Sequence, residues 1–209
     1  MVKSRDNFIS DRACVKVIIC YTDGLNFDEL KLRLPVGDDD LKTVSRFANE
    51  KDKILHLVSA YLKKKYVGKW TVNEFGKPIA DGKFFNVSHC KGAVVIALSD
   101  SEVGVDIENV RPVNESLINY VADKKETAYI KNDEDFFRLW TAKESLAKAH
   151  GKGLIRDVKT IPAFPFDGIK EYCGKRYYTR QFKDGDFIIA VTKIGEEPFK
   201  LEIDRDNLI

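Results

Sequence analysis

Three β-rich segments follow one another in the middle of the chain and limit the folds that it can adopt. They span residues 84–87, 93–98 and 103–108. The last segment alternates between apolar side chains and others with the period of two that a half-buried strand shows. We expect residues 99–102 to join it to the preceding segment as a hairpin. The centre of the sequence therefore predicts a small, largely antiparallel sheet.

Two carboxylates lie on one face of the last strand. Asp106 and Glu108 share this face, while Val103, Val105 and Ile107 lie on the other. Residues two apart along a strand are separated by about 7 Å, so the carboxylates repel each other unless a cation lies between them. This segment alone leaves two explanations open. The face is exposed to solvent, as in many antiparallel sheets, or it belongs to a cation-binding site.

A helix predicted over residues 136–150, and ended by Gly151, carries a carboxylate on its apolar side. At about 100° per residue, Glu144 falls inside the apolar arc and Lys148 lies at its edge. Lys143 also points toward the arc, although its long side chain could reach solvent. A Glu–Lys pair at this spacing is usually exposed and weak. A carboxylate inside the arc loses more by desolvation than such a pair returns, so it needs a strong partner such as a divalent cation.

The remaining sequence divides into two comparable α/β halves. Besides the central strands, the first half is expected to contain a strand at 15–21, a helical stretch at 41–66 with an interruption at Asn49 or Glu50, and a strand at 70–75. The second half is expected to contain helical segments at 115–121 and 124–130, a strand candidate at 158–161, and strands at 177–182, 186–192 and 199–203. Asp184-Gly185 predicts a hairpin turn between two of these strands. We place the boundary near residue 100, which gives subdomains 1–101 and 102–209.

Charge and composition exclude several classes of protein. Thirty-five basic and thirty-three acidic residues leave a formal charge of +2, which is too balanced to attract nucleic acid in bulk. No apolar run is long enough to cross a bilayer. Residues 1–14 include basic side chains but no hydrophobic region, so we expect an ordinary or frayed tail and no secretory signal.

The cysteines indicate a reducing compartment. Cys14, Cys20, Cys90 and Cys173 are scattered and form no Cys-x-x-Cys pair. Free cysteines without a secretory signal are typical of the cytoplasm, where we expect this protein. With only three histidines, a zinc site has few possible ligands. Any metal should therefore be a hard ion held by oxygen atoms.

Two motifs together resemble a known family. They are Gly104-Val105-Asp106-Ile107-Glu108 and Trp140-Thr141-Ala142-Lys143-Glu144-Ser145-Leu146-Ala147-Lys148. This pair and its spacing resemble the signature of the 4'-phosphopantetheinyl transferases of the Sfp type, which activate peptide synthetases, polyketide synthases and other carrier proteins. The resemblance covers roughly residues 41–154. It implies an α+β fold of two similar α/β subdomains related by a pseudo-two-fold axis, each with a small antiparallel sheet packed on helices.

The resemblance also implies an activity. The chain would transfer 4'-phosphopantetheine from coenzyme A to a serine of an apo carrier protein (acyl, peptidyl or aryl carrier) and release adenosine 3',5'-bisphosphate. Asp106, Glu108 and Glu144 would hold Mg2+ together with the pyrophosphate of coenzyme A. A hard dication would neutralise three converging carboxylates, which agrees with the repulsion between the two on the strand.

The same resemblance suggests residues for the chemistry. Lys148 would counter the charge that grows on the leaving oxygen and could protonate it. The base for the serine is either Glu144 or Glu126, and this choice stays open. Glu126 also has a structural explanation, because Asp123 and Glu126 have the spacing of a capping box at a helix start.

Residues of the first half match the family's coenzyme A site. Ser88 and His89 match an Asn-x-Ser-His element that reaches the phosphates, although a lone histidine is often structural. Lys77 and Pro78, in Gly76-Lys77-Pro78, match a turn beside the adenine, and in isolation would be only a turn. Lys53 lies where the family places a basic residue for the 3'-phosphate, and would act there as a point charge. Lys42 and Arg46 are further candidates for that role.

The sequence departs from the family pattern in two places. Cys90 and Lys91 follow His89 where the family commonly has a small residue and Gly, so Gly92 would have to substitute. After residues 151–154 relatives contact the carrier protein, and here the chain has an apolar loop at 162–166. That loop either contacts a carrier helix or packs its own aromatic side chains together.

Coenzyme A, Mg2+ and an apo carrier protein are therefore the expected partners of a monomer that binds neither nucleic acid nor membrane. Two other functions stay open. One is a different Mg2+-dependent enzyme, such as a phosphohydrolase, which leaves the matches at Ser88-His89 and Gly76-Lys77 unexplained. The other is a non-catalytic relative that binds coenzyme A or a carrier protein, which has no need for Asp106, Glu108, Glu144 and Lys148 together.

Overall fold

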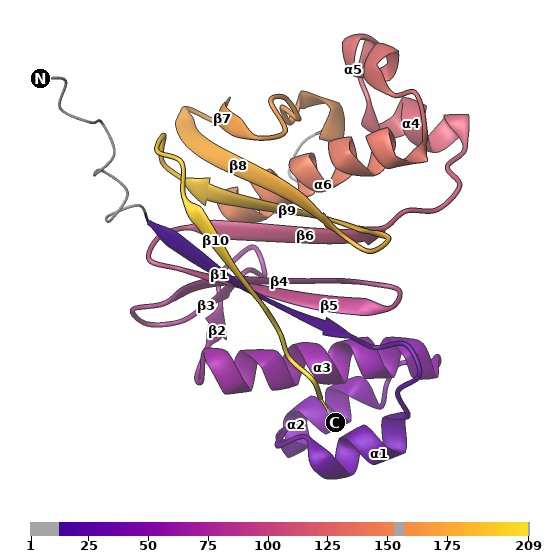
Figure 1. Ribbon diagram of the computed structural model, residues 1–209. Helices are drawn as coiled ribbons and strands as arrows, with labels where there is room; N and C mark the ends of the chain where they lie inside the picture. Colours follow the sequence, from indigo (N-terminus) through magenta and orange to yellow (C-terminus); the bar gives the residue numbers. More distant parts are fainter. Residues whose placement is uncertain (1–12, 153–156, 209) are drawn as a thin grey trace, which may run out of the picture.

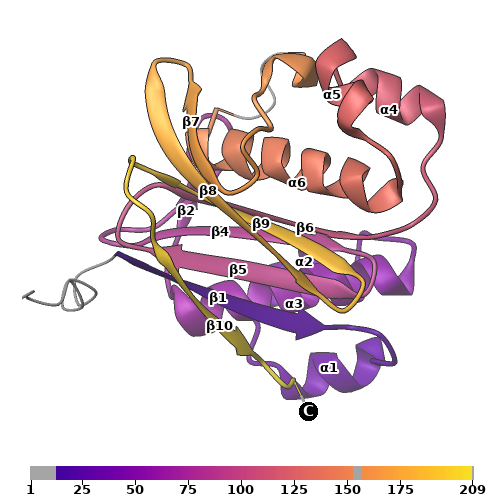
Figure 2. The ribbon, with the colours of Figure 1, turned by 45° about the horizontal axis from the view of Figure 1, so that its top comes forward.

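The chain folds into four layers, with two sheets between two groups of helices (Figures 1 and 2). The computed structural model describes residues 13–152 and 157–208. The first sheet has the strand order β10 (Lys200–Arg205), β1 (Cys14–Tyr21), β5 (Ala93–Ser99) and β4 (Phe84–Cys90). The second has the order β6 (Val103–Asn109), β9 (Phe187–Ile194), β8 (Lys175–Asp184) and β7 (Gly168–Tyr172). The predicted α+β class, with small and largely antiparallel sheets packed on helices, is confirmed.

The helices form the two outer layers. The helices beside the first sheet are α1 (Phe27–Arg33), α2 (Asp38–Val44) and α3 (Glu50–Tyr66). Those beside the second sheet are α4 (Glu115–Val121), α5 (Lys124–Tyr129) and α6 (Asp133–His150), followed by a single 3-10 turn, η1 (Val158–Thr160). A small separate hairpin joins β2 (Thr71–Val72) to β3 (Pro78–Ile79). Over residues 13–152 and 157–208, no helix combines the length and the apolar character needed to span a bilayer.

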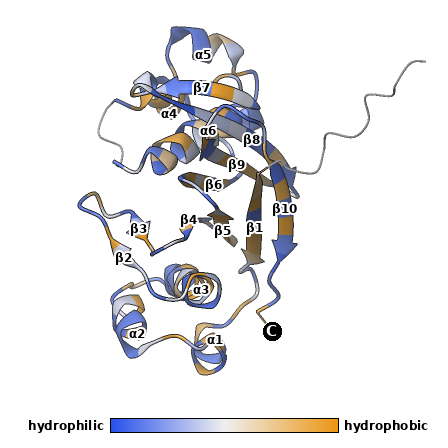
Figure 3. Cartoon of the chain, turned by 90° about the vertical axis from the view of Figure 1, so that its left-hand side faces the viewer, coloured by the Kyte–Doolittle hydropathy of each residue, from blue (hydrophilic) through white to orange (hydrophobic). Residues whose placement is uncertain are grey.

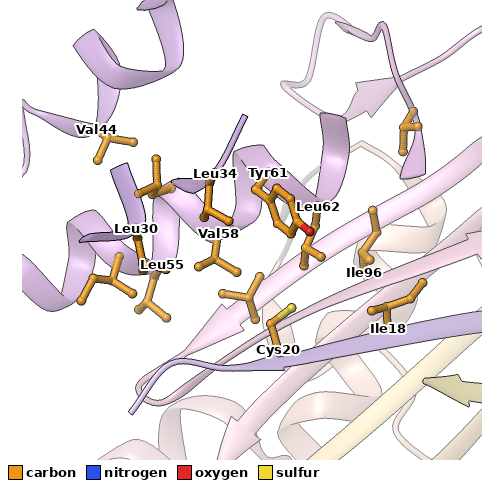
Figure 4. Packing of buried hydrophobic residues seen from close by; sticks show 14 of the residues in the cluster. Ile18, Cys20, Leu30, Leu34, Val44, Leu55, Val58, Tyr61, Leu62 and Ile96 are labelled. Carbon is orange, nitrogen blue, oxygen red and sulfur yellow. The ribbon is translucent and has the colours of Figure 1, made fainter. Parts of the chain in front are cut away.

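Apolar side chains fill the space between the layers. Figure 4 shows Val58 and Leu62 of α3 packed over Ile18 and Ile96 of the first sheet, where all four are buried. On the second sheet, α6 buries an equivalent apolar stripe that includes Leu146. Each fully buried side chain of this size stabilises the fold by about 1.5–3 kcal/mol relative to an exposed one.

A third apolar layer lies between the two sheets. Val17 and Val95 from the first sheet meet Val105 and Val191 from the second, and all are fully buried. Figure 3 shows the apolar colour along β1 and β9, one strand from each sheet. Each sheet packs one face on helices and its other face on the neighbouring sheet. The central strands are therefore apolar on both faces.

The strand β6 alternates as predicted, but neither of its faces is solvated. Val105 and its apolar neighbours point toward the first sheet, as the sequence indicates. The opposite face lies under α6, and Asp106 on that face is only 4% exposed. The explanation of an open, solvated face is therefore wrong for Asp106.

The predicted hairpin between the 93–98 and 103–108 segments is wrong. The strand β5 belongs to the first sheet, whereas β6 pairs with β9 in the second. Residues 99–102 therefore carry the chain from one sheet to the other. The physical reason is burial, because β5 and β6 both have apolar faces that can cover each other only when the strands lie in stacked sheets.

Several local predictions are confirmed and others need correction. Asn49 does interrupt the long helical stretch, since it caps α3 by accepting a hydrogen bond from Lys51 N–H. Gly151 ends α6 in the left-handed conformation with φ 78°, and Gly185 has φ 58° in the turn of the β8–β9 hairpin. The strand candidate at 158–161 is instead the turn η1, which Asp157 caps. The sequence patterns did not predict α1 or β7, and the strand expected at 70–75 shrinks to β2.

The last strand returns to the first sheet. The edge strand expected at 199–203 is present as β10, and it pairs in parallel with β1. The segment that ends the second half of the sequence thus completes the first sheet. The division into 1–101 and 102–209 stays a prediction, and residues 1–12 of the expected tail lie outside the described part of the chain.

Candidate active site

The edge strands of the two sheets, β4 and β6, are joined by side chains. The amide of Val105 donates a hydrogen bond to Oδ1 of Asn86 at 2.9 Å. Two residues further along β4 and one residue further along β6, Oγ of Ser88 donates to Oδ1 of Asp106 at 2.8 Å. Asn86 and Ser88 therefore share the face of β4 that meets the second sheet. Sequence analysis gave Asn86 no role of its own, although its spacing of two from Ser88 predicts a shared face.

A glycine allows α6 to approach β6 closely. A Cβ atom on Gly104 would lie less than 3.0 Å from the carbonyl oxygen of Ser145 and from the amide nitrogen of Ala149. Real Cβ atoms essentially never come so near, so the backbones could not keep this distance with any other residue. The close approach puts Glu144 and Lys148, one helical turn apart, beside the carboxylate of Asp106.

Lys148 forms a short ion pair with Asp106. Its Nζ lies 2.6 Å from Oδ1 of Asp106 and 2.9 Å from Oγ of Ser88. Lys148, Asp106 and Ser88 come from α6, β6 and β4. Their hydrogen bonds therefore connect three elements that are far apart in the sequence. A charge-assisted hydrogen bond of this kind, with a carboxylate that is almost fully buried, is a strong interaction.

Glu108 has its own partners. Its Oε1 accepts a hydrogen bond from Nε1 of Trp140 at 3.2 Å, and its Oε2 pairs with Arg111 at 2.9 Å. The Arg111 guanidinium lies over the ring of Phe137, 4.7 Å from its centre. Sequence reasoning missed Arg111. Its only signal is a basic residue three positions after Glu108.

Two carboxylate oxygens in this cluster are buried and have no hydrogen-bond partner among residues 13–152 and 157–208. They are Oδ2 of Asp106 and Oε1 of Glu144. Burial, followed by the nearby charge of Asp106, raises the pKa of Glu144 to about 7. Burial also raises the pKa of Glu108, while Arg111 opposes that shift. Unpaired buried oxygens are costly unless a cation or a proton joins them.

The oxygen donors suit a hard dication, and Mg2+ is the ion that the resemblance of the two motifs implies. Asp106 and Glu108 lie close enough to Glu144 for their charges to raise its pKa. In the described residues, no three His, Cys, Asp or Glu side chains are already grouped as metal ligands. The fit therefore rests on the two unpartnered oxygens and on the all-carboxylate donor set.

A cavity of about 290 Å³ opens beside the carboxylate of Glu144. Glu144 and Lys148 line one side, and the turn that contains Lys77 and Pro78 lines another. Nζ of Lys77 donates to the carbonyl oxygens of Ala149, at 3.1 Å, and Val103, at 3.3 Å. Lys77 thus neutralises the C-terminal end of α6, and burial lowers the pKa of this lysine.

Asn73 fixes that turn against α6. Its Oδ1 accepts hydrogen bonds from the amides of Phe75 and Lys77, and its Nδ2 donates to the carbonyl of Gly151 at 3.2 Å. Sequence reasoning missed Asn73. An Asn four residues before Lys77 in a turn is its only signal, because Asn side chains commonly bond the turn backbone.

Ser88 and His89 point to opposite faces of β4. His89 turns toward α3, where its ring meets that of His56 edge-on at 5.0 Å, and His56 stacks on Phe47 at 3.9 Å. Burial lowers the pKa of His89, and His56 and Lys148 add to the shift. The two residues that sequence analysis grouped are therefore close in space but line different surfaces.

The basic candidates on α2 and α3 lie apart from the carboxylates. Nζ of Lys53 sits 5.7 Å from the ring centre of Phe27. Lys42 pairs with Asp39 at 3.2 Å, and Arg46 is exposed after the end of α2. The hydrogen bonds of the described residues do not join Lys53 to Ser88 or Asp106.

Glu126 is held in a buried network. Its Oε2 accepts hydrogen bonds from the amide of Asp123 at 2.9 Å and from Nζ of Lys143 at 2.8 Å. Lys143 is fully buried and also donates to the carbonyls of Val121 and Val158. The capping-box explanation of Glu126 is confirmed. The suggestion that Lys143 reaches solvent is wrong, because Glu126 and the two carbonyls satisfy its ammonium inside the protein.

Aromatic side chains of the 162–166 loop pack together with a side chain of α5. Tyr129 and Phe164 have ring centres 4.7 Å apart, and Phe164 and Phe166 are 4.8 Å apart. Tyr129 and Phe164 keep exposed surface. The loop thus packs its own aromatics and still presents apolar surface. Residues 153–156 of the preceding segment lie outside the described chain.

Comparisons with known proteins agree with the motifs. Residues 102–192 match the family model described as the 4'-phosphopantetheinyl transferase superfamily. The 4'-phosphopantetheinyl transferase gsp of Aneurinibacillus migulanus is 32% identical over 136 residues, which cover 57% of this chain and 57% of that protein. Sfp of Bacillus subtilis (strain 168) is 34% identical over 95 residues, covering 41% and 42%. Psf-1 of Bacillus pumilus is 34% identical over 104 residues, covering 42% of each. The aligned part is thus between 42% and 57% of the length of these relatives.

Proposed function

We propose that the chain is a 4'-phosphopantetheinyl transferase that modifies apo carrier proteins, since residues 102–192 match the model of that superfamily. In the reaction, a carrier serine oxygen bonds to the phosphorus that bears the pantetheine of coenzyme A. The bond from that phosphorus to the bridging oxygen breaks, and adenosine 3',5'-bisphosphate leaves. The meeting of Ser88, Asp106 and Lys148 beside the 290 Å³ cavity is the observation that carries this proposal.

Asp106, Glu108 and Glu144 would hold Mg2+ in this site. The unpartnered oxygens of Asp106 and Glu144 support this assignment, because a buried carboxylate oxygen is stabilised by a cation. When bound, the ion neutralises diphosphate charge and polarises the phosphoryl oxygens. The residues of the chain supply its position, since β6 and α6 fix the three carboxylates relative to the cavity.

Lys148 would stabilise the leaving group. Its ammonium lines the cavity and ends a side chain that is 29% exposed, so it is free to turn toward a bound phosphate. Charge grows on the bridging oxygen as the bisphosphate leaves, and a nearby ammonium lowers the energy of that charge. The same group can give the departing oxygen a proton.

Glu144 is the favoured base for the carrier serine. It lines the cavity and keeps one oxygen without a hydrogen-bond partner. Glu126 is the second candidate, but one of its oxygens already accepts two hydrogen bonds inside a buried network. A proton on Glu126 would weaken this buried ion pair with Lys143, which disfavours Glu126 as the base.

The first half of the chain would bind most of the nucleotide. Lys77 and Pro78 line the same cavity as Glu144, which supports their place beside the coenzyme. Ser88 would contact the diphosphate from the side of β6, and His89 would contact phosphate from the side of α3. Lys53 would serve the 3'-phosphate as a point charge, after leaving its contact with the Phe27 ring.

The second half would hold the metal and contact the carrier protein. The exposed surface of Tyr129 and Phe164 supports an apolar contact of this kind. We further propose that the protein acts as a monomer in the cytoplasm. The boundary between the subdomains, near residue 101, would then separate nucleotide binding from carrier binding.

One assay tests the function. The protein is incubated with coenzyme A, Mg2+ and an apo carrier protein, and the carrier is weighed by mass spectrometry. A phosphopantetheine increment supports transfer. An unchanged carrier with hydrolysed coenzyme A supports the phosphohydrolase alternative, and no turnover supports a non-catalytic binding protein.

A pair of variants makes the assay specific. Asp106→Ala should reduce transfer by at least about a hundred-fold, because it removes a buried metal ligand. Asp100→Ala is the matched control, since Asp100 is exposed and its partners in the described part of the chain are nearby serines and Lys193. Full activity of a folded Asp106→Ala protein would remove Asp106 from the site.

A further inference from the structure

The ammonium of Lys148 is already paired with the carboxylate of Asp106, which is a proposed ligand of the dication. Lys148 Nζ lies 2.6 Å from Oδ1 of Asp106, which itself is 4% exposed. Ser88 donates to the same oxygen, so this oxygen has two donors while Oδ2 has none. Asp106 thus has one saturated and one free oxygen.

We propose that Lys148 is the resident counter-ion of the acidic cluster, and that a divalent cation binds Asp106 in competition with it. This inference rests on the proposed function and adds an order of events to it. The metal alone binds weakly, because it must share Asp106 with an ammonium that repels it. The metal together with coenzyme A binds tightly, because the diphosphate receives the ammonium.

The surroundings of Lys148 allow this exchange. Its side chain is 29% exposed, so its end is not locked into the core. The 290 Å³ cavity is lined by Lys148 itself and offers the ammonium another position. When a cation displaces Lys148 from Asp106, the ammonium can pair with an anion in that cavity. Binding of the cation and binding of the anion therefore favour each other.

Glu108 has a second counter-ion, but the two pairs differ. Arg111 donates to Glu108 and also to the carbonyl of Asn109, and it packs on Phe137. These additional contacts hold Arg111 in place whether or not Glu108 binds a metal. Lys148 contacts only Ser88 and Asp106 through its ammonium among the described residues, so its position depends on the carboxylate.

The test measures binding of Mn2+ to the full chain without nucleotide, by calorimetry. Lys148→Met should bind Mn2+ about ten-fold more tightly than the natural chain, because the competing charge is gone. Lys148→Arg keeps the charge and should bind Mn2+ as weakly as the natural chain. Lys175→Met is the control for net charge, since Lys175 pairs with Glu102 on the surface, and it should leave Mn2+ affinity unchanged.

Other outcomes overturn the inference. Equal or weaker Mn2+ binding by a folded Lys148→Met protein shows that the ammonium does not compete. An equal gain in Lys175→Met shows only a general effect of charge. If Lys148→Met fails to fold, the NMR signal of the Lys148 ammonium in the natural chain decides. It should move when Mg2+ saturates the protein, and an unmoved signal contradicts the exchange.

The outcome for the transfer reaction is separate. If no carrier is modified but Mn2+ binds more tightly to Lys148→Met, the proposed function fails and the counter-ion exchange stands. If the carrier is modified and Lys148→Met leaves Mn2+ affinity unchanged, the exchange fails and the function stands. A further measurement repeats the titration with coenzyme A present. Coenzyme A should raise Mn2+ affinity more in the natural chain than in Lys148→Met, and equal gains count against the exchange.

Discussion

The amide of Val105 donates to the side chain of Asn86 at 2.9 Å, and this bond joins the edge strands of two separate sheets. A side chain here does what a backbone carbonyl does within a sheet. The bond also fixes the position of the neighbouring pair, in which Ser88 lies two residues beyond Asn86 and Asp106 directly follows Val105. The geometry of the candidate site therefore depends on Asn86, which also lines the 290 Å³ cavity.

Asn86→Ala should weaken both stability and transfer. The amide of Val105 would stay buried without a partner, at a cost of about 1–3 kcal/mol in the free energy of unfolding. The transfer rate should fall by at least about ten-fold as Asp106 loses its register, since small displacements of reacting groups are costly. Urea unfolding and the carrier mass assay measure the two effects. Asn119→Ala, on the exposed side of α4, is the control. An Asn86→Ala protein with normal stability and activity contradicts this role.

Gly104→Ala should prevent α6 from packing on β6. The new methyl group would lie within 3.0 Å of backbone atoms of Ser145 and Ala149, and backbone atoms cannot swing aside as a side chain can. Overpacking in a core typically costs about 1–3 kcal/mol, and rigid neighbours put this change at or above that range. Thermal unfolding checks the loss. Gly37→Ala is the matched control, because its Cβ would meet only the end of Asp40 at 3.5 Å. Similar melting temperatures for the two variants count against a steric role for Gly104.

Lys170→Met should stabilise the protein most near neutral pH. Lys170 is 2% exposed, its ammonium has no hydrogen-bond partner in the part of the chain that the structure describes, and burial lowers its pKa to about 7. Between its ordinary pKa of about 10.4 and pH 7, the unfolded chain binds a proton that the folded chain does not. The natural chain thus loses stability as the pH falls through this window, by up to about 1.4 kcal/mol per pH unit.

Urea unfolding at pH 7, 8 and 9 should show this trend. The advantage of Lys170→Met over the natural chain should shrink as the pH rises, because the penalty on the lysine disappears. Lys175→Met, which removes an exposed lysine from the neighbouring strand, should show no such trend. A constant difference across the three pH values means that Lys170 does not titrate as its burial implies.

Lys143→Met should be strongly destabilising, whereas a double change should not be. Lys143 and Glu126 lie 2.8 Å apart with side chains 0% and 8% exposed. Removing the lysine leaves a buried carboxylate unpaired, at a cost of about 3–5 kcal/mol. Combining Lys143→Met with Glu126→Leu removes both charges and should recover much of the loss. A double-mutant cycle from urea unfolding measures the coupling, and simple additivity of the two changes contradicts a tight pair.

The local features of this protein follow from its sequence alone. The alternation of β6 predicted that Asp106 and Val105 lie on opposite faces, and the helical periodicity of α6 predicted that Glu144 is buried. Both predictions are confirmed. The sequence also predicted the capping box of Asp123 and Glu126 and the end of α6 at Gly151. These features depend on backbone geometry and on neighbours a few residues apart, so a short window of sequence contains all the information that they need.

The tertiary structure decided which of these pieces meet. The sequence spacing paired Lys148 with Glu144, but in the fold Lys148 bonds Asp106, which is 42 residues away. The chain between β5 and β6 suggested a hairpin, but stacked sheets bury the apolar faces of both strands and so β6 pairs with β9. Several strand arrangements satisfy the same local pattern. Only the burial of distant surfaces against one another selects among them, and that is a property of the whole chain.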